Sequence, residues 1–296
     1  MRNLIDIIDV HLSYDTASGK LPVLDGFSMS VPEGGFVAVV GPSGCGKSTL
    51  TRLIAGLMKP DQGEVWLHGQ QVTSPRASVG MAFQNPVLLE WRSILKNIML
   101  PLEIVPTTLS KKDQEDRARY LLALVGLEGF EQKRPSELSG GMRQRASLCR
   151  ALIHQPDVLI LDEPFGALDA FTREDLWQIM HEVKDREPFT GVMITHDLRE
   201  SIYLADQVVV MSGRPAKTQY VLDLPVTGAR SIETLYTPEA SEMLKVLRRE
   251  IEVAQGRATG VDATTRASVS AGASTRPTAA SSAAATSAKD NGGSGQ

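Results

Sequence analysis

Short apolar runs recur along most of the chain, and segments with helical periodicity lie between them. The runs are rich in valine, leucine and isoleucine, which is typical of strands. We expect strands at 4–10, 36–40, 64–67, 79–83, 158–161, 191–194 and 207–211. Strands that alternate with helices favour an α/β core, and uninterrupted apolar runs favour parallel strands that are buried on both faces.

Two helical patterns complete the expected core. Apolar residues at positions i, i+3, i+4 and i+7 mark one face of a first helix: Leu50, Leu53, Ile54 and Leu57. The sequence Lys-Pro-Asp-Gln-Gly at 59–63 ends that helix. From 88 to 150 helical periodicity prevails with few strand signals, which predicts a helical subdomain inserted into the α/β core.

The composition of the chain changes at residue 254. From there to 296 the sequence is mostly Ala, Ser, Thr and Gly, without an aromatic residue. Such a segment cannot bury enough apolar surface to offset its conformational entropy. We therefore expect a folded domain at 1–253 and a disordered, low-complexity tail at 254–296, and a tail without a specific function is the simplest interpretation.

Charge and cysteine content narrow the class of protein. The chain has 31 basic and 35 acidic residues, a net charge of −4, which disfavours a nucleic-acid partner. Its two cysteines, Cys45 and Cys149, cannot build a disulfide framework, which fits the reducing cytosol. The longest apolar run, at 36–40, is far shorter than the roughly 20 residues of a membrane-spanning helix, so we expect no span.

A glycine-rich loop follows the strand at 36–40 and precedes the first helix. It matches the pattern G-x-x-x-x-G-K-[ST] in full and supplies these candidate phosphate-binding residues: Gly41, Pro42, Ser43, Gly44, Cys45, Gly46, Lys47, Ser48 and Thr49. A strand, a glycine loop and a helix together direct backbone N–H groups at a phosphate. Lys47 adds a cation, and the Ser48 hydroxyl suits Mg²⁺. The alternative, a glycine-rich turn before an ordinary helix, explains this context less well.

Two carboxylates end the apolar strand at 158–161. Ligands bind beyond the carboxyl ends of such strands, so Asp162 is a candidate Mg²⁺ ligand and Glu163 a candidate base for an attacking water. Two merely exposed carboxylates are the alternative. A second candidate anion site is Leu-Ser-Gly-Gly at 138–141, where Ser139 can cap a helix and Gly140 and Gly141 leave room for a phosphate. Taken alone, that segment favours a simple capped helix.

The order of the motifs resembles that of the ATP-binding cassette (ABC) ATPases, the nucleotide-binding subunits of ABC transporters. The motifs are the phosphate loop, Gln84 in MAFQNP, LSGG, LDEP, Gly166-Ala-Leu-Asp169 and Ile194-Thr-His196-Asp. The resemblance covers about 4–225. It implies an α/β fold with a P-loop NTPase core, an antiparallel β subdomain and a helical subdomain, and it implies ATP hydrolysis with ATP and Mg²⁺ as cofactors.

The resemblance also implies roles for single residues. Tyr14 matches the aromatic residue that stacks on adenine. Gln84 matches the residue that reaches Mg²⁺ and the attacking water and links the site to the membrane partner. His196 matches the switch histidine that contacts the γ-phosphate, and Asp169 belongs to the loop that crosses the dimer interface.

A shared active site follows from the same resemblance. Ser139, Gly140 and Gly141 would bind the γ-phosphate held by a second copy of the chain, in a head-to-tail, two-fold dimer. Two positions depart from the family pattern. Met142 stands where glutamine is usual, and Gly166 stands where serine is common, so one hydrogen-bonding group is missing at each.

The segment after Gln84 resembles the nitrate/sulfonate/taurine importers. Its sequence is NPVLLEWRSILKNIMLPL, with Glu90 in place of the usual proline before Trp91, and GRP at 213–215 resembles the next segment of that subfamily. The resemblance implies a peripheral protein on the cytoplasmic face of the cell membrane, with separate permease subunits and, indirectly, a periplasmic or extracellular solute-binding protein. Leu88, Leu89 and Trp91 either line the groove for the permease or belong to the core.

Three other functions stay open at this stage. They are import of a different small solute, ATPase work in DNA repair or on ribosomes, and a non-hydrolysing scaffold; the intact Glu163 and His196 disfavour the scaffold. One chemical expectation concerns Cys45. It lies beside Lys47 and ahead of a helix N-terminus, both of which favour a thiolate, so we expect Cys45 to react faster than Cys149 and MgATP to slow its labelling.

Overall fold

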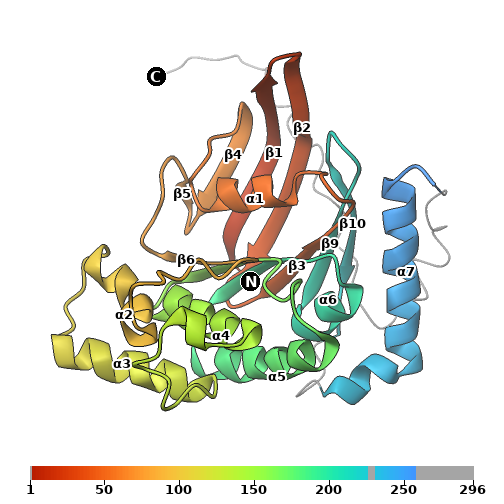
Figure 1. The fold of residues 1–296 in the computed structure, drawn as a ribbon. Helices are drawn as coiled ribbons and strands as arrows, with labels where there is room; N and C mark the ends of the chain where they lie inside the picture. The colour runs from red at the N-terminus through yellow and green to blue at the C-terminus, as the bar shows by residue number, and fades with distance from the viewer. Residues whose placement is uncertain (1, 226–230, 258–296) are drawn as a thin grey trace, which may run out of the picture.

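The computed structural model describes residues 2–225 and 231–257, which form two sheets with helices around them (Figure 1). The larger sheet has six strands in the order β10-β9-β3-β8-β7-β6, and the smaller has four in the order β2-β1-β4-β5. The strands are β1 (Asn3–Thr16), β2 (Gly19–Pro32), β3 (Phe36–Val40), β4 (Gln62–Leu67), β5 (Gln70–Gln71), β6 (Val79–Phe83), β7 (Val158–Asp162), β8 (Thr190–Ile194), β9 (Gln207–Met211) and β10 (Thr218–Asp223).

The six-stranded sheet is the core of the molecule. Its strands β9, β3, β8, β7 and β6 run parallel, and only β10 pairs antiparallel with its neighbour β9. Every residue of β3 and β8 is buried, as expected of parallel strands that are covered on both faces. The carboxyl ends of all five parallel strands therefore lie along one edge.

The four-stranded antiparallel sheet covers one face of this core. β1 and β2 form a long hairpin, and β4 pairs antiparallel with β1. Its apolar side packs on α1 (Lys47–Ile54) and on the valines and isoleucines of β3, β7 and β8 that point the same way. The phosphate loop consequently lies between the two sheets.

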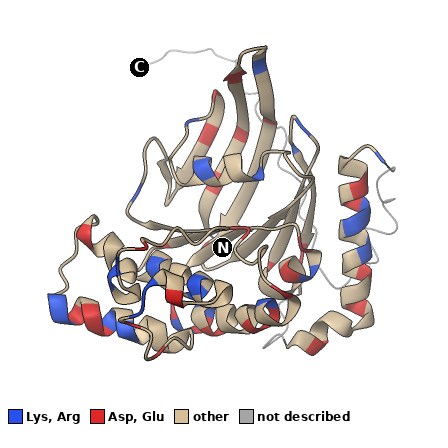
Figure 2. Cartoon of the chain, viewed as in Figure 1, with Lys and Arg blue, Asp and Glu red and all other residues tan. Residues whose placement is uncertain are grey.

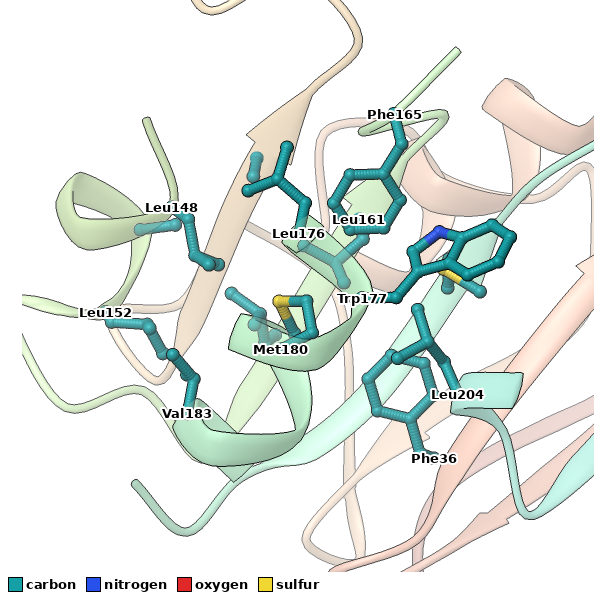
Figure 3. Close-up of a cluster of buried hydrophobic side chains, with 14 of the residues drawn as sticks. Phe36, Leu148, Leu152, Leu161, Phe165, Leu176, Trp177, Met180, Val183 and Leu204 are labelled. Atoms are coloured by element: carbon teal, nitrogen blue, oxygen red, sulfur yellow. The ribbon is translucent and has the colours of Figure 1, made fainter. Parts of the chain in front are cut away.

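Helices cover the opposite face of the core sheet. They are α2 (Ile94–Ile98), α3 (Lys111–Leu124), α4 (Gly140–Leu152), α5 (Ala170–Arg186) and α6 (Leu198–Leu204). Figure 3 shows Trp177 and Met180 of α5 packed among Leu161 of β7, Leu204 of α6 and Phe36 of β3. The helical region expected at 88–150 contains α2, α3 and α4, together with two short 3-10 turns, η1 (Leu100–Glu103) and η2 (Pro135–Glu137).

The carboxyl-terminal part of the described chain adds one more helix. After the short turn η3 (Ile232–Tyr236), α7 (Pro238–Ala254) packs on α6 and β9 and stands at the side of the molecule (Figure 1). It ends where the composition changes. The tail expected from 254 to 296 lies almost wholly outside the described residues, so its expected disorder stays a prediction.

The first helix is shorter than its apolar pattern predicted. α1 ends at Ile54, and Leu57 is 55% exposed rather than part of the buried face. The cause is Gly56, whose φ of +70° turns the chain, while the Leu57 N–H bonds back to the carbonyl of Arg52. This is the usual way in which glycine closes a helix.

The charged residues are dispersed over the surface. Figure 2 shows acidic and basic residues interspersed along α3, α5 and α7. Within 2–225 and 231–257, no helix has the length and the apolar composition needed to cross a membrane.

Candidate functional site

A cavity of about 520 Å³ opens at the carboxyl edge of the core sheet, beneath the antiparallel sheet. The residues that line it are Tyr14, Leu21, Val23, Ser43, Gly44, Gly46, Lys47, Ser48, Thr49, Glu163, His196 and Arg214. They come from segments that are far apart in the sequence. The topology brings them together, because the loops after β3, β7 and β8 all leave the same edge of the sheet.

The loop after β3 leads into a helix, α1, whose first turn has no side-chain cap. Gly46 precedes α1 with a φ of +122°. A Cβ at Gly46 would lie 2.8 Å from a Val23 methyl carbon, so glycine is required there by space as well as by conformation. An uncapped helix N-terminus attracts an anion through its free N–H groups and its dipole.

Lys47 is folded back over its own loop. Its Nζ donates to the carbonyl oxygens of Gly41 and Pro42 at 2.9 and 3.0 Å, and the residue is 7% exposed. These bonds fix the ammonium group beside the loop, and Lys47 also lines the cavity. The arrangement places a fixed positive charge beside the N–H groups of the loop and so adds to its preference for an anion.

Ser48 and Asp162 pair a hydroxyl with a carboxylate at the edge of this loop. Ser48 Oγ donates to Asp162 Oδ1 at 3.4 Å. Burial raises the pKa of Asp162, the bond from Ser48 opposes this, and the neighbouring Glu163 carboxylate raises the pKa further. Both groups are hard oxygen donors, the kind that Mg²⁺ prefers, and a cation here would favour the charged carboxylate that burial disfavours.

Glu163 and His196 lie next to each other in the lining of the cavity. Glu163 Oε2 and His196 Nδ1 are 3.3 Å apart, while the Glu163 N–H donates to the carbonyl of Ile194 at 2.9 Å. Glu163 has a φ of +49°, a conformation that non-glycine residues adopt rarely and that clusters at functional sites. The carboxylate therefore projects from a constrained turn rather than from a freely moving loop.

Gln84 approaches the same place from β6. Phe83, the last residue of β6, is opposite Asp162 in the sheet, so Gln84 begins the loop beside the two carboxylates. A Cβ on Gly166 would lie 3.4 Å from His196 Cε1 and 3.5 Å from Gln84 Nε2. Gly166 thus has both side chains as neighbours, although Gln84 does not line the cavity itself.

Tyr14 lines the cavity near the start of α1. Its hydroxyl is 3.1 Å from Thr49 Oγ1 and donates to Met58 Sδ at 3.4 Å. The ring is thereby held next to the glycine loop, in a position compatible with contact to a nucleotide base. Stacking on adenine stays a prediction.

The second candidate anion site lies away from this cavity. Ser139 caps α4, accepting from the Met142 N–H at 3.3 Å, and Gly140 is exposed. A Cβ on Gly141 would be 2.5 Å from the Thr172 methyl carbon, so α5 requires that glycine. Ser139, Gly140, Gly141 and Asp169 do not line the cavity of their own chain.

Asp169 also has a structural role within one chain. Its carboxylate caps α5, accepting from the Thr172 N–H at 3.0 Å and from the Thr172 hydroxyl at 2.7 Å. These bonds from Thr172 hold the pKa of Asp169 below its ordinary value. The charged form therefore persists at an exposed position at the head of the helix.

The structure contradicts the expected thiolate at Cys45, while its faster reaction than Cys149 and its protection by MgATP stay predictions. The thiol is 1% exposed and belongs to the apolar cluster beneath α1. Burial raises its pKa, and the nearby charges of Lys47 and Arg214 only partly oppose that effect. Cys45 is thus a packed thiol. Burial also strongly raises the pKa of Cys149, which is completely buried.

Three charged residues near the site were not anticipated from the sequence, nor were the apolar lining residues Leu21 and Val23. Arg214, in the GRP segment, lines the cavity and donates through Nε to the carbonyl of Gly44 at 3.0 Å. The GRP pattern indicates the importer subfamily, but it does not by itself predict that Arg214 reaches the phosphate loop. Arg173 and Glu200 lie behind His196, and their spacing from the motifs carries no signal of its own. Glu200 is 3% exposed, and burial raises its pKa to about 8.

Comparisons with known proteins agree with this geometry. Residues 24–166 match the ABC transporter family. An aliphatic sulfonates import ATP-binding protein, SsuB of Bacillus cereus (strain ZK / E33L), is 38% identical over 232 residues, which are 78% of this chain and 90% of that protein. The nitrate import ATP-binding protein NrtD of Synechococcus elongatus is 42% identical over 224 residues, or 75% of this chain and 82% of NrtD.

A solved structure shares the fold. The dimeric, post-hydrolysis state of the ATP-binding cassette MJ0796, bound to ADP and Pi, superposes with a TM-score of 0.66 at 27% identity, over 74% of this chain and 98% of that chain. The expected fold class and ATP binding are confirmed by these similarities. The chain therefore belongs to the ABC transporter family of ATP-binding proteins, and it is an ATPase.

Proposed function

We propose that this ATPase powers import of a small anion, such as a sulfonate or nitrate, from the cytoplasmic face of the cell membrane. The observation that carries the proposal is the meeting of the loop at 41–48, Glu163 and His196 in one cavity. The import function draws on the relatives, whose names describe sulfonate and nitrate import. Which solute is transported depends on partner subunits that select it.

The residues of the cavity have distinct proposed tasks. The N–H groups of the loop and Lys47 bind the phosphates of ATP, and Tyr14 contacts the base. Glu163 orients the attacking water and accepts its proton, and His196 contacts the γ-phosphate. The two side chains lie side by side, with Glu163 Oε2 3.3 Å from His196 Nδ1. Positioning and charge stabilisation of this kind provide most of the catalysis in phosphoryl transfer.

Mg²⁺ fits the oxygen donors beside the loop. Ser48, Asp162 and Gln84 would hold it, and when bound it supplies positive charge that neutralises the phosphates. The 3.4 Å spacing of Ser48 Oγ and Asp162 Oδ1 brings two of these donors together without a large movement.

A second copy of the chain completes the proposed site. Ser139, Gly140 and Gly141 are an uncharged anion cradle at a helix N-terminus, and they lie outside the cavity of their own chain. A head-to-tail dimer would place them on the γ-phosphate held by the partner. The dimeric state of the MJ0796 cassette supports this arrangement.

The permease would dock on the helical side of the core. A groove of about 290 Å³ lies there between β6 and the turn η1, lined by apolar residues and rimmed by Arg76, Arg150 and His154. Leu88, which was considered for such a groove, is instead buried in the core. Trp91 does not line this groove, but it is 74% exposed, and we propose it as a second contact for the permease.

Asn97 fixes the loop that displays Trp91. The residue is completely buried, and its side chain accepts from the Leu89 N–H at 2.6 Å and donates to the carbonyls of Leu89, Arg92 and Ser93. A large apolar side chain on a well-ordered loop loses little entropy when it binds a partner.

Substitution of Glu163 tests the catalytic part of the proposal. Glu163→Gln should abolish ATP turnover while ATP affinity stays unchanged, because Lys47 and the loop amides are intact. MgATP should then convert the variant from monomer to dimer in size-exclusion chromatography. Retained turnover, or monomers only at saturating MgATP, would refute the assignment.

Trp91→Ala tests docking separately. It should preserve ATPase activity of the isolated subunit and weaken co-purification with the membrane subunits. Identifying the permease and its neighbouring solute-binding protein in the same preparation would indicate which solute is imported. A Trp91→Ala variant that recovers as much permease as the wild-type protein would remove Trp91 from the interface.

A further inference from the structure

One guanidinium group beside the cavity holds two loops together. Arg173 lies in the first turn of α5, and its Nη1 donates to Asp197 Oδ2 at 2.8 Å, while its Nη2 donates to the carbonyl of Leu168 at 2.9 Å. The planar fork of arginine makes such paired contacts, whereas the single ammonium of lysine cannot reproduce both.

The first of these loops carries Asp169. Leu168 precedes it directly, and the backbone N–H of Arg173 also donates to the carbonyl of Asp169 at 3.0 Å. Arg173 therefore holds two successive carbonyls of this loop, one through its side chain and one through its backbone. Any displacement of the loop must move the guanidinium group or break these bonds.

The second loop carries His196. Asp197 begins α6, where its Oδ1 accepts from the Arg199 N–H at 2.9 Å, and its own N–H donates to Thr195 Oγ1 at 2.9 Å. Thr195 is tied to the core sheet through the carbonyl of Val39 at 3.2 Å, and its hydroxyl donates to the buried Glu200. His196 thus projects, with its side chain 60% exposed, from between two residues that are fixed on both sides.

We propose that Arg173 is a positioning residue that couples the loop of His196 to the loop of Asp169. The inference rests on the proposed function, in which a second copy completes the site and His196 contacts the γ-phosphate, and on the resemblance to the ABC ATPases, which implies that the loop of Asp169 crosses the dimer interface. When the second copy packs on Asp169, the Arg173 fork transmits the position of that loop to Asp197 and His196. Dimer closure and the catalytic placement of His196 are thereby linked within one chain.

Arg173→Lys is the informative substitution, because lysine can keep the ion pair with Asp197 while losing the second contact to Leu168. We expect kcat to fall about tenfold, while ATP affinity of the monomer stays within about twofold. In a Glu163→Gln background, the ATP concentration that gives half-maximal dimer should rise about tenfold. Asp197→Asn, which retains an oxygen to accept from Arg199, should give the same pattern if the lysine variant does not fold.

Lys184→Met provides a matched control on the same helix. Lys184 Nζ pairs with Asp206 Oδ2 at 2.9 Å, in a similarly half-buried setting but away from both loops. This variant should lose an ion pair of the same kind and leave kcat and the dimerisation midpoint unchanged. If the role of Arg173 is purely structural, Arg173→Lys should resemble this control: each variant would have a lower melting temperature, with kcat and the dimerisation midpoint unchanged.

Asp169→Ala and His196→Ala, assayed alongside, separate two kinds of failure. If both lower turnover and Arg173→Lys behaves as wild type, the coupling is wrong and the proposed function stands. If neither lowers turnover, the proposed roles of these loops are wrong, and the inference is overturned with them. Impaired Arg173→Lys with an unaffected Lys184→Met supports the coupling.

Discussion

The buried carboxyl group of Glu200 should make the stability of this protein fall as the pH rises. Glu200 lies in the first turn of α6 and is 3% exposed. Burial raises its pKa most, the hydrogen bond from Thr195 lowers it, the Asp197 carboxylate raises it, and Arg173 and Trp177 lower it, which leaves a pKa of about 8 against an ordinary 4.5. The side chain is therefore mostly neutral at pH 7.

The sign and size of the effect follow from linkage. A carboxyl whose pKa is higher in the folded state binds its proton more tightly when folded, so its contribution to stability is fully present below pH 4.5 and is lost as the pH rises to about 8. The free energy of unfolding should fall by about 1.4 kcal/mol for each pH unit in that window. The whole loss amounts to about 5 kcal/mol above the window.

Glu200→Gln should remove this dependence, because an amide resembles the neutral carboxyl at every pH. Urea unfolding of the wild-type and variant proteins between pH 5.5 and 8.5 measures the effect, since other titrating groups cancel in the difference. The free energy of unfolding of the variant, relative to that of the wild type, should rise by about 3 kcal/mol from pH 5.5 to pH 8.5. A difference that does not change with pH would show that the folded protein holds Glu200 ionised, and would refute the reasoning.

Glu187→Gln is the control for removing a buried carboxylate that has a partner. Glu187 is 8% exposed and accepts from Arg117 Nη2 at 2.7 Å. Neutralising it leaves the Arg117 charge without its counter-ion, so this variant should be less stable than wild type at pH 8.5. The two glutamates should thus respond to the same chemical change with opposite signs.

Three further substitutions test the site and its supports. Gly166→Ser should fold normally and change ATPase activity less than about threefold, because its Cβ would meet His196 at an ordinary 3.4 Å; a tenfold loss would contradict this. In the native protein, Cys45 should react slowly with maleimide, and rapid labelling would show that the thiol is accessible. Asn97→Ala should destabilise the protein by about 2 kcal/mol in urea unfolding, because Leu89 loses both of its bonds to the side chain; unchanged stability would mean that water replaces them.

The strands of the core sheet were predictable because burial on both faces leaves an uninterrupted apolar run. The runs at 36–40, 79–83 and 207–211 coincide with β3, β6 and β9. β2, β10 and the two-residue strand β5 were missed. β2 is half exposed and contains Gly26 and Pro22, and its register is set by pairing with β1 over a hairpin, which depends on long-range contacts rather than on local pattern.

The phosphate loop, Glu163 and His196 were predictable for a different reason. A phosphate loop depends on glycines and backbone N–H groups of consecutive residues, so the pattern at 41–48 is visible in the sequence itself. Glu163 and His196 needed only one further fact, that parallel strands end at a common edge. Arg173 and Glu200 lacked such a rule, because a charged residue on a helix is usually solvated. In the folded protein they bond to Asp197 and Thr195, the two residues that flank His196.

The environment of Cys45 could not be predicted from its neighbours along the chain. Its neighbours along the chain, Lys47 and the helix N-terminus, do favour a thiolate, and Lys47 does lower the pKa in the folded protein. The larger effect is desolvation, and it arises from the way in which the loop folds: the thiol turns inward, so that a Cβ on Gly41 would lie 3.3 Å from Cys45 Sγ. Desolvation raises the pKa of the Cys45 thiol, and the charge of Lys47 lowers it. Which effect is larger depends on whether the side chain points into the cavity or beneath it. In this loop the Cys45 side chain packs in the apolar cluster beneath α1, so desolvation outweighs the nearby positive charges.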